Sequence, residues 1–413
     1  MNSNYFRLYE ECYLVNGEEQ ACIYDLFNEK VFHLDMELKN ILIMAENNKS
    51  LNEISKELGI KREELEEKLK RIEANQVGGF YVNPPFIEKV TLHPSWKDNL
   101  FFKLPPQLNR AFIELNSECN ENCFFCDSKR YSLRFRCMGC RKRKIDSKRV
   151  TIEKWKEYLE QLYVLEIREL YITGGNVFLE IDKLKEIIGF SKKLGFRNIT
   201  VVSGIKDMNA MIQLGDMAHG VRFIMQRYLD EDYMKQIEND PIINYLGCLE
   251  KSHYLFVFIL DYHNKHLVND IATRLLRNLG KGSFYFDYLL DFENMTDEQL
   301  KEIKFTGDRI TLTDFSIRTK FNPCLKSTIS ITADGVITTC PGLREYPLSE
   351  NGTLMEAVAS DNLKKYTTLN CNKIEPCNKC EYRYLCNDCR YIEIMNGALL
   401  NQTKLCIRSR TVQ

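Results

Sequence analysis

The sequence has no excess of charge of either sign and no long apolar run. Its 57 Lys and Arg residues almost balance 58 Asp and Glu residues, so the formal net charge is -1. A near-neutral chain offers no overall attraction to nucleic acid or to an anionic membrane. The start, MNSNYFRLYEEC, lacks the apolar stretch of a signal peptide, and no later segment is long and uncharged enough to span a bilayer. We therefore expect a cytoplasmic protein with no membrane or nucleic-acid partner.

Histidine is scarce, and its six residues show no paired spacing that would predict a metal site. Cysteine, in contrast, occurs 16 times. In a reducing compartment disulfides do not explain so many thiols, which predicts metal or redox chemistry. Three of them, Cys12, Cys22 and Cys248, stand alone in apolar surroundings, and we expect these to be small packed side chains.

A chain of 413 residues is long enough for two or three domains. Residues 1–90 contain three runs with strand character, FRLYEECYLV, QACIYDLF and KVFHLD, followed by three helical patterns, which predicts a winged-helix-like α+β unit. The helical patterns are recognised by an apolar face in the first, Ser50 and Glu53 in capping-box spacing in the second, and Leu65, Leu69 and Ile72 in the third. The proline-rich stretch from Asn83 to Pro106 does not favour a helix, and we assign residues 91–110 to a linker.

Strands alternate with amphipathic helices in residues 111–310. The six candidate strands are AFIELN, ELYIT, NITVVS, VRFIMQ, YLFVFIL and SFYFDYLL. Several are apolar throughout, as is typical of parallel strands that are covered on both faces. This pattern predicts an α/β fold with a partial (β/α)6 barrel, whose chemistry should gather at the carboxyl ends of the strands.

Three cysteines follow the first of these strands directly. Cys119, Cys123 and Cys126 are separated by three and then two residues. A structural zinc site uses four ligands, whereas a four-iron cluster held by three thiolates leaves one iron free for an outside ligand. The alternative is a zinc knuckle that recruits Cys137 or Cys140 as its fourth ligand.

This spacing resembles the signature of the radical S-adenosylmethionine (SAM) superfamily. The resemblance implies that Phe125 packs near the adenine and that Gly174-Gly175, with Asn176 in place of the usual Glu, meets the methionine amino group. Ser203 resembles a polar residue that contacts SAM. The resemblance further implies that the free iron binds SAM, that one electron splits its sulfonium, and that the resulting radical abstracts hydrogen from a substrate. A donor such as flavodoxin or ferredoxin would supply the electron.

The carboxyl-terminal part, residues 311–413, holds a second cysteine array that resembles the SPASM auxiliary-cluster domain. Its eight thiols are Cys324, Cys340, Cys371, Cys377, Cys380, Cys386, Cys389 and Cys406. Eight thiols suffice for two further four-iron clusters, so that the chain would carry three [4Fe-4S] clusters in all. The resemblance implies a second group of Cys377, Cys380, Cys386 and Cys406 and a first group of Cys324, Cys340 and Cys389. In the first group Cys371 is the candidate fourth ligand, or one iron is left open for substrate. Only two residues separate Cys386 from Cys389, where the family usually has three, and a pair of zinc sites is the alternative.

Together these features resemble maturases of ribosomally made peptides. The expected function is to install a cross-link, such as a cysteine thioether, in a precursor peptide whose leader binds residues 1–90. In that unit the face formed by Leu65, Leu69 and Ile72 can wall a peptide groove, or it can be core. The basic insertion from Lys129 to Arg149 is either a solvated loop or a track for an acidic peptide. The alternatives are a maturase of a folded protein, similar to sulfatase activators, and a zinc-stabilised binding module without catalysis.

Overall fold

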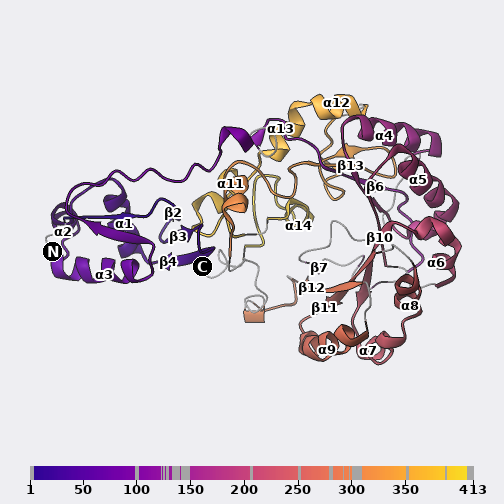
Figure 1. Ribbon diagram of the computed structural model, residues 1–413, viewed down its shortest axis with the longest axis horizontal. Coiled ribbons are helices and arrows are strands. Elements are labelled where there is room, and N and C mark those ends of the chain that lie inside the picture. Colours follow the sequence, from indigo (N-terminus) through magenta and orange to yellow (C-terminus); the bar gives the residue numbers. More distant parts are fainter. Residues whose placement is uncertain are drawn as a thin grey trace.

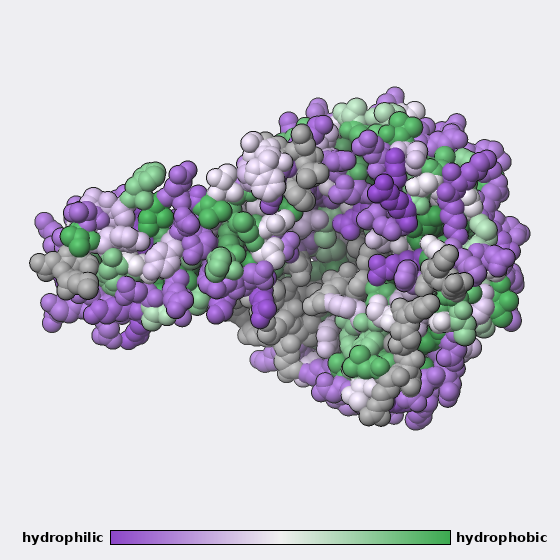
Figure 2. Space-filling model, in the orientation of Figure 1, coloured by the Kyte–Doolittle hydropathy of each residue, from purple (hydrophilic) through white to green (hydrophobic). Residues whose placement is uncertain are grey.

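The computed structural model describes residues 4–97, 102–121, 123, 126, 130–132, 140, 149–204, 208–249, 253–278, 282–291, 293–296, 298–299, 309–349, 353–386 and 388–406. The amino-terminal unit and the barrel lie at opposite ends of the molecule, with the carboxyl-terminal module against both (Figure 1). In the space-filling view the amino-terminal unit forms a narrow lobe beside a broader body (Figure 2). None of the helices in these ranges is long and apolar enough to cross a membrane.

The amino-terminal unit combines two small antiparallel sheets with three helices. The larger sheet has the order β2 (Cys12–Asn16), β3 (Ala21–Asp25), β4 (Lys30–Leu34). The first predicted strand run is in fact divided into β1 (Tyr5–Leu8) and β2, because a turn at residues 9–11 closes with a bond from Cys12 N to Tyr9 O of 3.1 Å. Strand β1 pairs instead with β5 (Gly78–Tyr81), which the sequence pattern did not predict.

The predicted helical faces are confirmed in α1 (Met36–Glu46), α2 (Leu51–Leu58) and α3 (Arg62–Ala74). The predicted capping box forms at the start of α2, where Ser50 and Glu53 exchange hydrogen bonds. The apolar face of α3 is at most 5% exposed and belongs to the core of the unit. These side chains therefore do not wall an open groove, because α3 must bury them against α1, α2 and the strands.

The two lone amino-terminal thiols are buried as expected, but Cys248 is not. Cys12 and Cys22 are fully buried. Cys248 is the last residue of α8 (Pro241–Cys248) and is exposed, because the buried face of this short helix is formed by Ile242, Ile243 and Leu246. The prediction for Cys248 was wrong.

The six predicted barrel strands are confirmed as neighbouring parallel strands. They are β6 (Arg110–Glu114), β8 (Glu169–Thr173), β9 (Asn198–Ser203), β10 (Val221–Tyr228), β11 (His253–Leu260) and β12 (Ser283–Asp291). Figure 1 shows them as an arc with helices on the outside, namely α4 (Ile152–Val164), α5 (Ile181–Leu194), α6 (Met208–Leu214), α7 (Glu231–Gln236), α8 and α9 (Val268–Asn278). One face of the strands joins the large core beneath these helices, while Val202, Ile224, Leu255 and Val257 form a separate buried cluster. Burial on both faces explains why these strands are almost wholly apolar.

The carboxyl-terminal module extends the barrel sheet. Its helices are α11 (Leu312–Lys320), α12 (Leu354–Ala359), α13 (Asp361–Thr367) and α14 (Arg390–Met395). Strand β13 (Thr328–Ile331) pairs in parallel with β6 and in antiparallel with β14 (Ile337–Thr338), and at the other edge β7 (Arg130–Ser132) pairs with β12. This module and the barrel therefore share one hydrogen-bonded sheet.

The amino-terminal unit docks on the carboxyl-terminal module through its larger sheet. We call the buried residues at this contact the interface cluster: Val15, Cys22, Tyr24, Leu26, Ile310, Phe315, Tyr384 and Leu385. The hydroxyl of Tyr24 donates to the carbonyl of Glu381 at 2.9 Å, and Arg383 donates to the carbonyl of Asn16 at 2.8 Å. The amino-terminal unit thus packs on the loop between Cys380 and Cys386.

Candidate functional site

The three-cysteine loop follows the carboxyl end of β6, and its first thiol, Cys119, is five residues beyond Glu114, the last residue of this strand. Cys119, Cys123 and Cys126 are each half-buried, so their thiols are not sealed from an outside ligand. The loop is tied locally by a bond from Cys126 N to Cys123 O of 2.9 Å and by a contact from Glu121 N to the Cys119 Sγ of 3.4 Å. The predicted placement of the loop at the carboxyl edge of the parallel sheet is confirmed.

The glycine turn after β8 packs against this loop. Gly175 N donates to Asn116 O at 3.1 Å, and Asn176 N donates to Glu118 O at 2.6 Å. A Cβ on Gly174 would lie 2.6 Å from Asn116 O, and one on Gly175 would overlap the carbonyl of Glu118. Glycine is therefore required at both positions so that the two backbones can approach.

Asn176 joins the turn to the cysteine loop through its side chain. Its Nδ2 donates to Asn120 Oδ1 at 2.9 Å, and its Oδ1 accepts from Phe178 N at 3.1 Å. Asn116, which is fully buried, reciprocates by donating from Nδ2 to Asn176 O at 2.8 Å. The sequence pattern does not single out Asn116, and its only signal is its position as the last residue of the predicted strand AFIELN.

A fourth thiol lies beside the three. The Sγ of Cys140 is 3.2 Å from the position that a Cβ on Gly204 would occupy, just beyond the end of β9. Burial, followed by the neighbouring thiols of the loop, raises the pKa of Cys140 to about 12. Ser203, the predicted SAM contact at the end of β9, is 1% exposed. Phe125 and Cys137 lie outside the described residues.

A buried cation faces the same edge of the sheet from the next strand. Arg227 is 3% exposed, and its Nη1 donates to the carbonyls of Gly204 at 3.0 Å and Gln226 at 3.1 Å. Its Nη2 is buried without a hydrogen-bond partner in the described part of the chain. Its Nε lies 4.0 Å from Oδ2 of Asp240, which is 7% exposed, so a buried carboxylate already faces this guanidinium.

The second cysteine group assembles around Cys386. Its electrostatic neighbours include Cys377, Cys380 and Cys406, which are the thiols that we assigned to one cluster, and burial raises its pKa. The thiol of Cys371 is hydrogen-bonded to Cys377, and this bond is the main cause that lowers the pKa of Cys377 to about 7. Cys371, which the resemblance offers as a fourth ligand of the first group, thus contacts a thiol of the second group.

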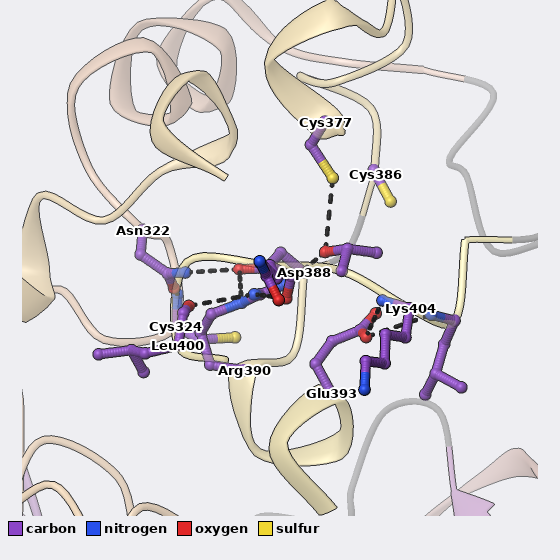
Figure 3. Close-up of polar contacts among 12 residues, drawn as sticks. Asn322, Cys324, Cys377, Cys386, Asp388, Arg390, Glu393, Leu400 and Lys404 are labelled. Atoms are coloured by element: carbon purple, nitrogen blue, oxygen red, sulfur yellow. Dashed lines mark hydrogen bonds and ion pairs between the residues drawn. The ribbon is translucent and has the colours of Figure 1, made fainter. Parts of the chain in front are cut away.

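Contacts between their neighbours bring the segments of the first group together. Asn322 lies two residues before Cys324, and Asp388 lies one residue before Cys389. The side chain of Asn322 donates a hydrogen bond to Asp388 Oδ2 at 2.8 Å (Figure 3). Gly342, two residues after Cys340, packs so closely on the ring of Tyr391 that a Cβ would not fit. Within the described residues, no three His, Cys, Asp or Glu side chains are arranged to hold a single metal ion.

No protein-family model and no curated protein matches the chain. It is similar to crystal structures of SuiB from Streptococcus suis, which are 11 or 12% identical in sequence. The structure bound to S-adenosylmethionine has a TM-score of 0.45, the one bound to precursor peptide SuiA 0.43, and a third structure 0.44. Each comparison covers 97% of this chain and 99% of the other. At these values the likeness is distant, and the function proposed below rests on this chain's own residues.

Proposed function

We propose that the protein is a radical SAM enzyme that modifies a ribosomally made precursor peptide. The observation that carries the proposal is the three-thiol loop at the carboxyl edge of the parallel sheet, tied to the Gly174-Gly175 turn by backbone hydrogen bonds. Three thiolates suit a four-iron cluster with one open iron, whereas a zinc site would recruit the neighbouring Cys140 as its fourth ligand.

Different residues around the loop would bind the cluster and SAM. Cys119, Cys123 and Cys126 would hold the cluster, which supplies the electron that cleaves SAM when both are bound. Asn176 would contact SAM through the outer edge of an amide already fixed by Asn120 and Phe178, and its first task is to hold the loop against the turn.

The decisive experiment replaces the three loop cysteines together by Ala. We expect reductive SAM cleavage to be lost while the auxiliary iron of the carboxyl-terminal module stays bound. Cys248→Ala is the matched control, since this thiol is exposed and remote from both cysteine arrays in sequence. Continued formation of deoxyadenosine by the triple variant would refute the proposal.

The eight carboxyl-terminal thiols would hold two auxiliary clusters. In support, the thiol of Cys386 is close enough to the other three thiols of the second group for them to raise its pKa beyond the effect of burial. The chain segments around the three thiols of the first group, Cys324, Cys340 and Cys389, also converge. With all three clusters, anaerobically purified protein should contain about a dozen irons per chain. Zinc in their place, at about one ion per four thiols, would favour the non-catalytic alternative.

The substrate is proposed to be a peptide whose leader adds to the free edge of β4. This strand pairs with β3 alone among the described strands, and a disordered peptide can extend a sheet edge through backbone hydrogen bonds. Nucleic acid is disfavoured, because three of the four cations of α3 are already paired with carboxylates: Arg62 with Glu66, Lys68 with Glu64, and Arg71 with Glu67.

A leader test separates this substrate from a folded protein. Full-length precursor should be processed much faster than leaderless peptide, with SAM cleavage in the absence of peptide unchanged. Cross-linking, for example of a cysteine thioether, would appear as a loss of two hydrogens in the peptide mass. Equal processing of both peptides and no measurable leader binding would show that the unit is not a leader reader.

A further inference from the structure

The last described residues form a strap with little regular structure. We call residues 400–406 the carboxyl-terminal strap, and it ends in Cys406. Backbone bonds join it to Glu375 at two points: Glu375 N donates to Asn401 O at 3.0 Å, and Thr403 N donates to Glu375 O at 2.7 Å. So few backbone bonds leave the position of Cys406 dependent on side chains.

Arg390, the first residue of α14, supplies such bonds to residues 400–403, while Glu393 Oε2 accepts from Lys404 N at 2.8 Å and from Leu405 N at 3.2 Å. The Nη1 of Arg390 donates to Gln402 O at 2.8 Å and to Leu400 O at 3.2 Å, and its Nη2 donates to Thr403 Oγ1 at 2.9 Å (Figure 3). The same Thr403 Oγ1 contacts the Cys377 Sγ at 3.5 Å. Arg390 therefore sets the strap, and the strap in turn touches the second cysteine group.

The other side of Arg390 is anchored to the first cysteine group. Its Nε donates to both carboxylate oxygens of Asp388, at 2.7 and 2.8 Å, and the side chains of the pair are 1% and 7% exposed. Asp388 also accepts from Asn322, whose Oδ1 accepts from Cys324 N at 3.0 Å. One chain of hydrogen bonds thus connects the segment of Cys324 with the strap that carries Cys406.

A buried ion pair contributes little net stability, because the desolvation of two charges offsets their attraction. Its value here is geometric, since a planar guanidinium with five fixed N–H groups can bind a carboxylate on one edge and three acceptors on the other. We propose that Arg390 is a positioning residue that places Cys406 beside Cys377 and Cys386, and so completes the second cluster site. The inference rests on the proposed function in treating this group as a cluster site.

The test is Arg390→Lys in the full-length, anaerobically purified chain, because Lys keeps the charge but not the fork. We expect the iron content to fall by about four atoms per chain, which is one cluster. In iron-free protein we expect alkylation of Cys406, followed by mass spectrometry, to become about tenfold faster, while alkylation of Cys324 is unchanged. Arg7→Lys is the matched control, since Arg7 is also buried and paired with a carboxylate, Glu46, far from the cysteines in sequence.

A second variant guards against misfolding of the first. Replacing the pair together, with Asp388→Leu and Arg390→Met, removes both charges at similar volume and should give the same loss of iron and the same exposure of Cys406. Unchanged iron and unchanged Cys406 alkylation would overturn the proposal, as would equal losses in Arg390→Lys and Arg7→Lys. If wild-type protein binds no iron, the proposed function fails, but the alkylation of Cys406 still decides the role of Arg390.

Discussion

The docking of the amino-terminal unit should depend measurably on one hydroxyl. Tyr24 is fully buried, its ring lies 5.1 Å from that of Phe315 and 6.1 Å from that of Tyr384, and its hydroxyl donates to Glu381 O. Tyr24→Phe keeps the rings together but leaves a buried carbonyl unsatisfied, which costs about 1.5 kcal/mol. Tyr24→Ala also leaves a cavity and should cost about 3–5 kcal/mol.

Hydrogen exchange measured by mass spectrometry can report this contact locally. If β2 and β3 open when the unit undocks, Tyr24→Phe should speed exchange of their amides by about tenfold, and Tyr24→Ala by more than about a hundredfold. Tyr81→Phe is the control, since Tyr81 lies on β5 outside the interface cluster. Unchanged exchange in β2 and β3 of Tyr24→Phe, or an equal rise in the control, would refute the docking energetics.

Two further predictions concern two titratable side chains, Cys12 and Lys89. Burial and then Asp25 raise the pKa of Cys12 to about 12, so iodoacetamide at pH 8 should modify Cys12 at least about a thousandfold more slowly than the exposed Cys248, and comparable rates would contradict its burial. Burial lowers the pKa of Lys89, partly offset by Glu46, so the folded state binds fewer protons than the unfolded state as the pH approaches 10.5. The free energy of unfolding should then rise with pH in that range, and this slope should be smaller in Lys89→Met; equal slopes would show that Lys89 titrates alike in both states.

Much of the barrel could be predicted because each strand is recognised from the pattern of its own residues. Each parallel strand is covered on both faces, so it appears as an apolar run, and the residues after it are bound to lie at the carboxyl edge of the sheet. The position of Cys119, Cys123 and Cys126 beside the turn at Gly174-Gly175 follows from strand order alone. Likewise the capping box of Ser50 and Glu53 depends only on residues three apart.

Spacing in the sequence was a poorer guide where distant segments meet. The run from Phe6 to Val15 has continuous strand character, yet its two halves join different sheets, because the residues of β1 pair with residues 70 to 76 positions later in the chain. The apolar face of α3 had two possible uses, core or groove, and packing against α1 and α2 made it core. Cys248 has apolar neighbours in the chain but lies on the exposed side of α8.

By itself, the sequence determined the six-strand α/β core, the three-thiol loop at its edge and the concentration of thiols near the carboxyl end. Only the tertiary structure decided that β13 joins β6, that Cys371 lies with Cys377, that Cys140 approaches the loop, and that Tyr24 rests on Glu381. The physical reason is the range of the interactions. Strand periodicity and capping act between near neighbours, whereas these contacts depend on which surfaces remain to be buried once the separate elements have packed.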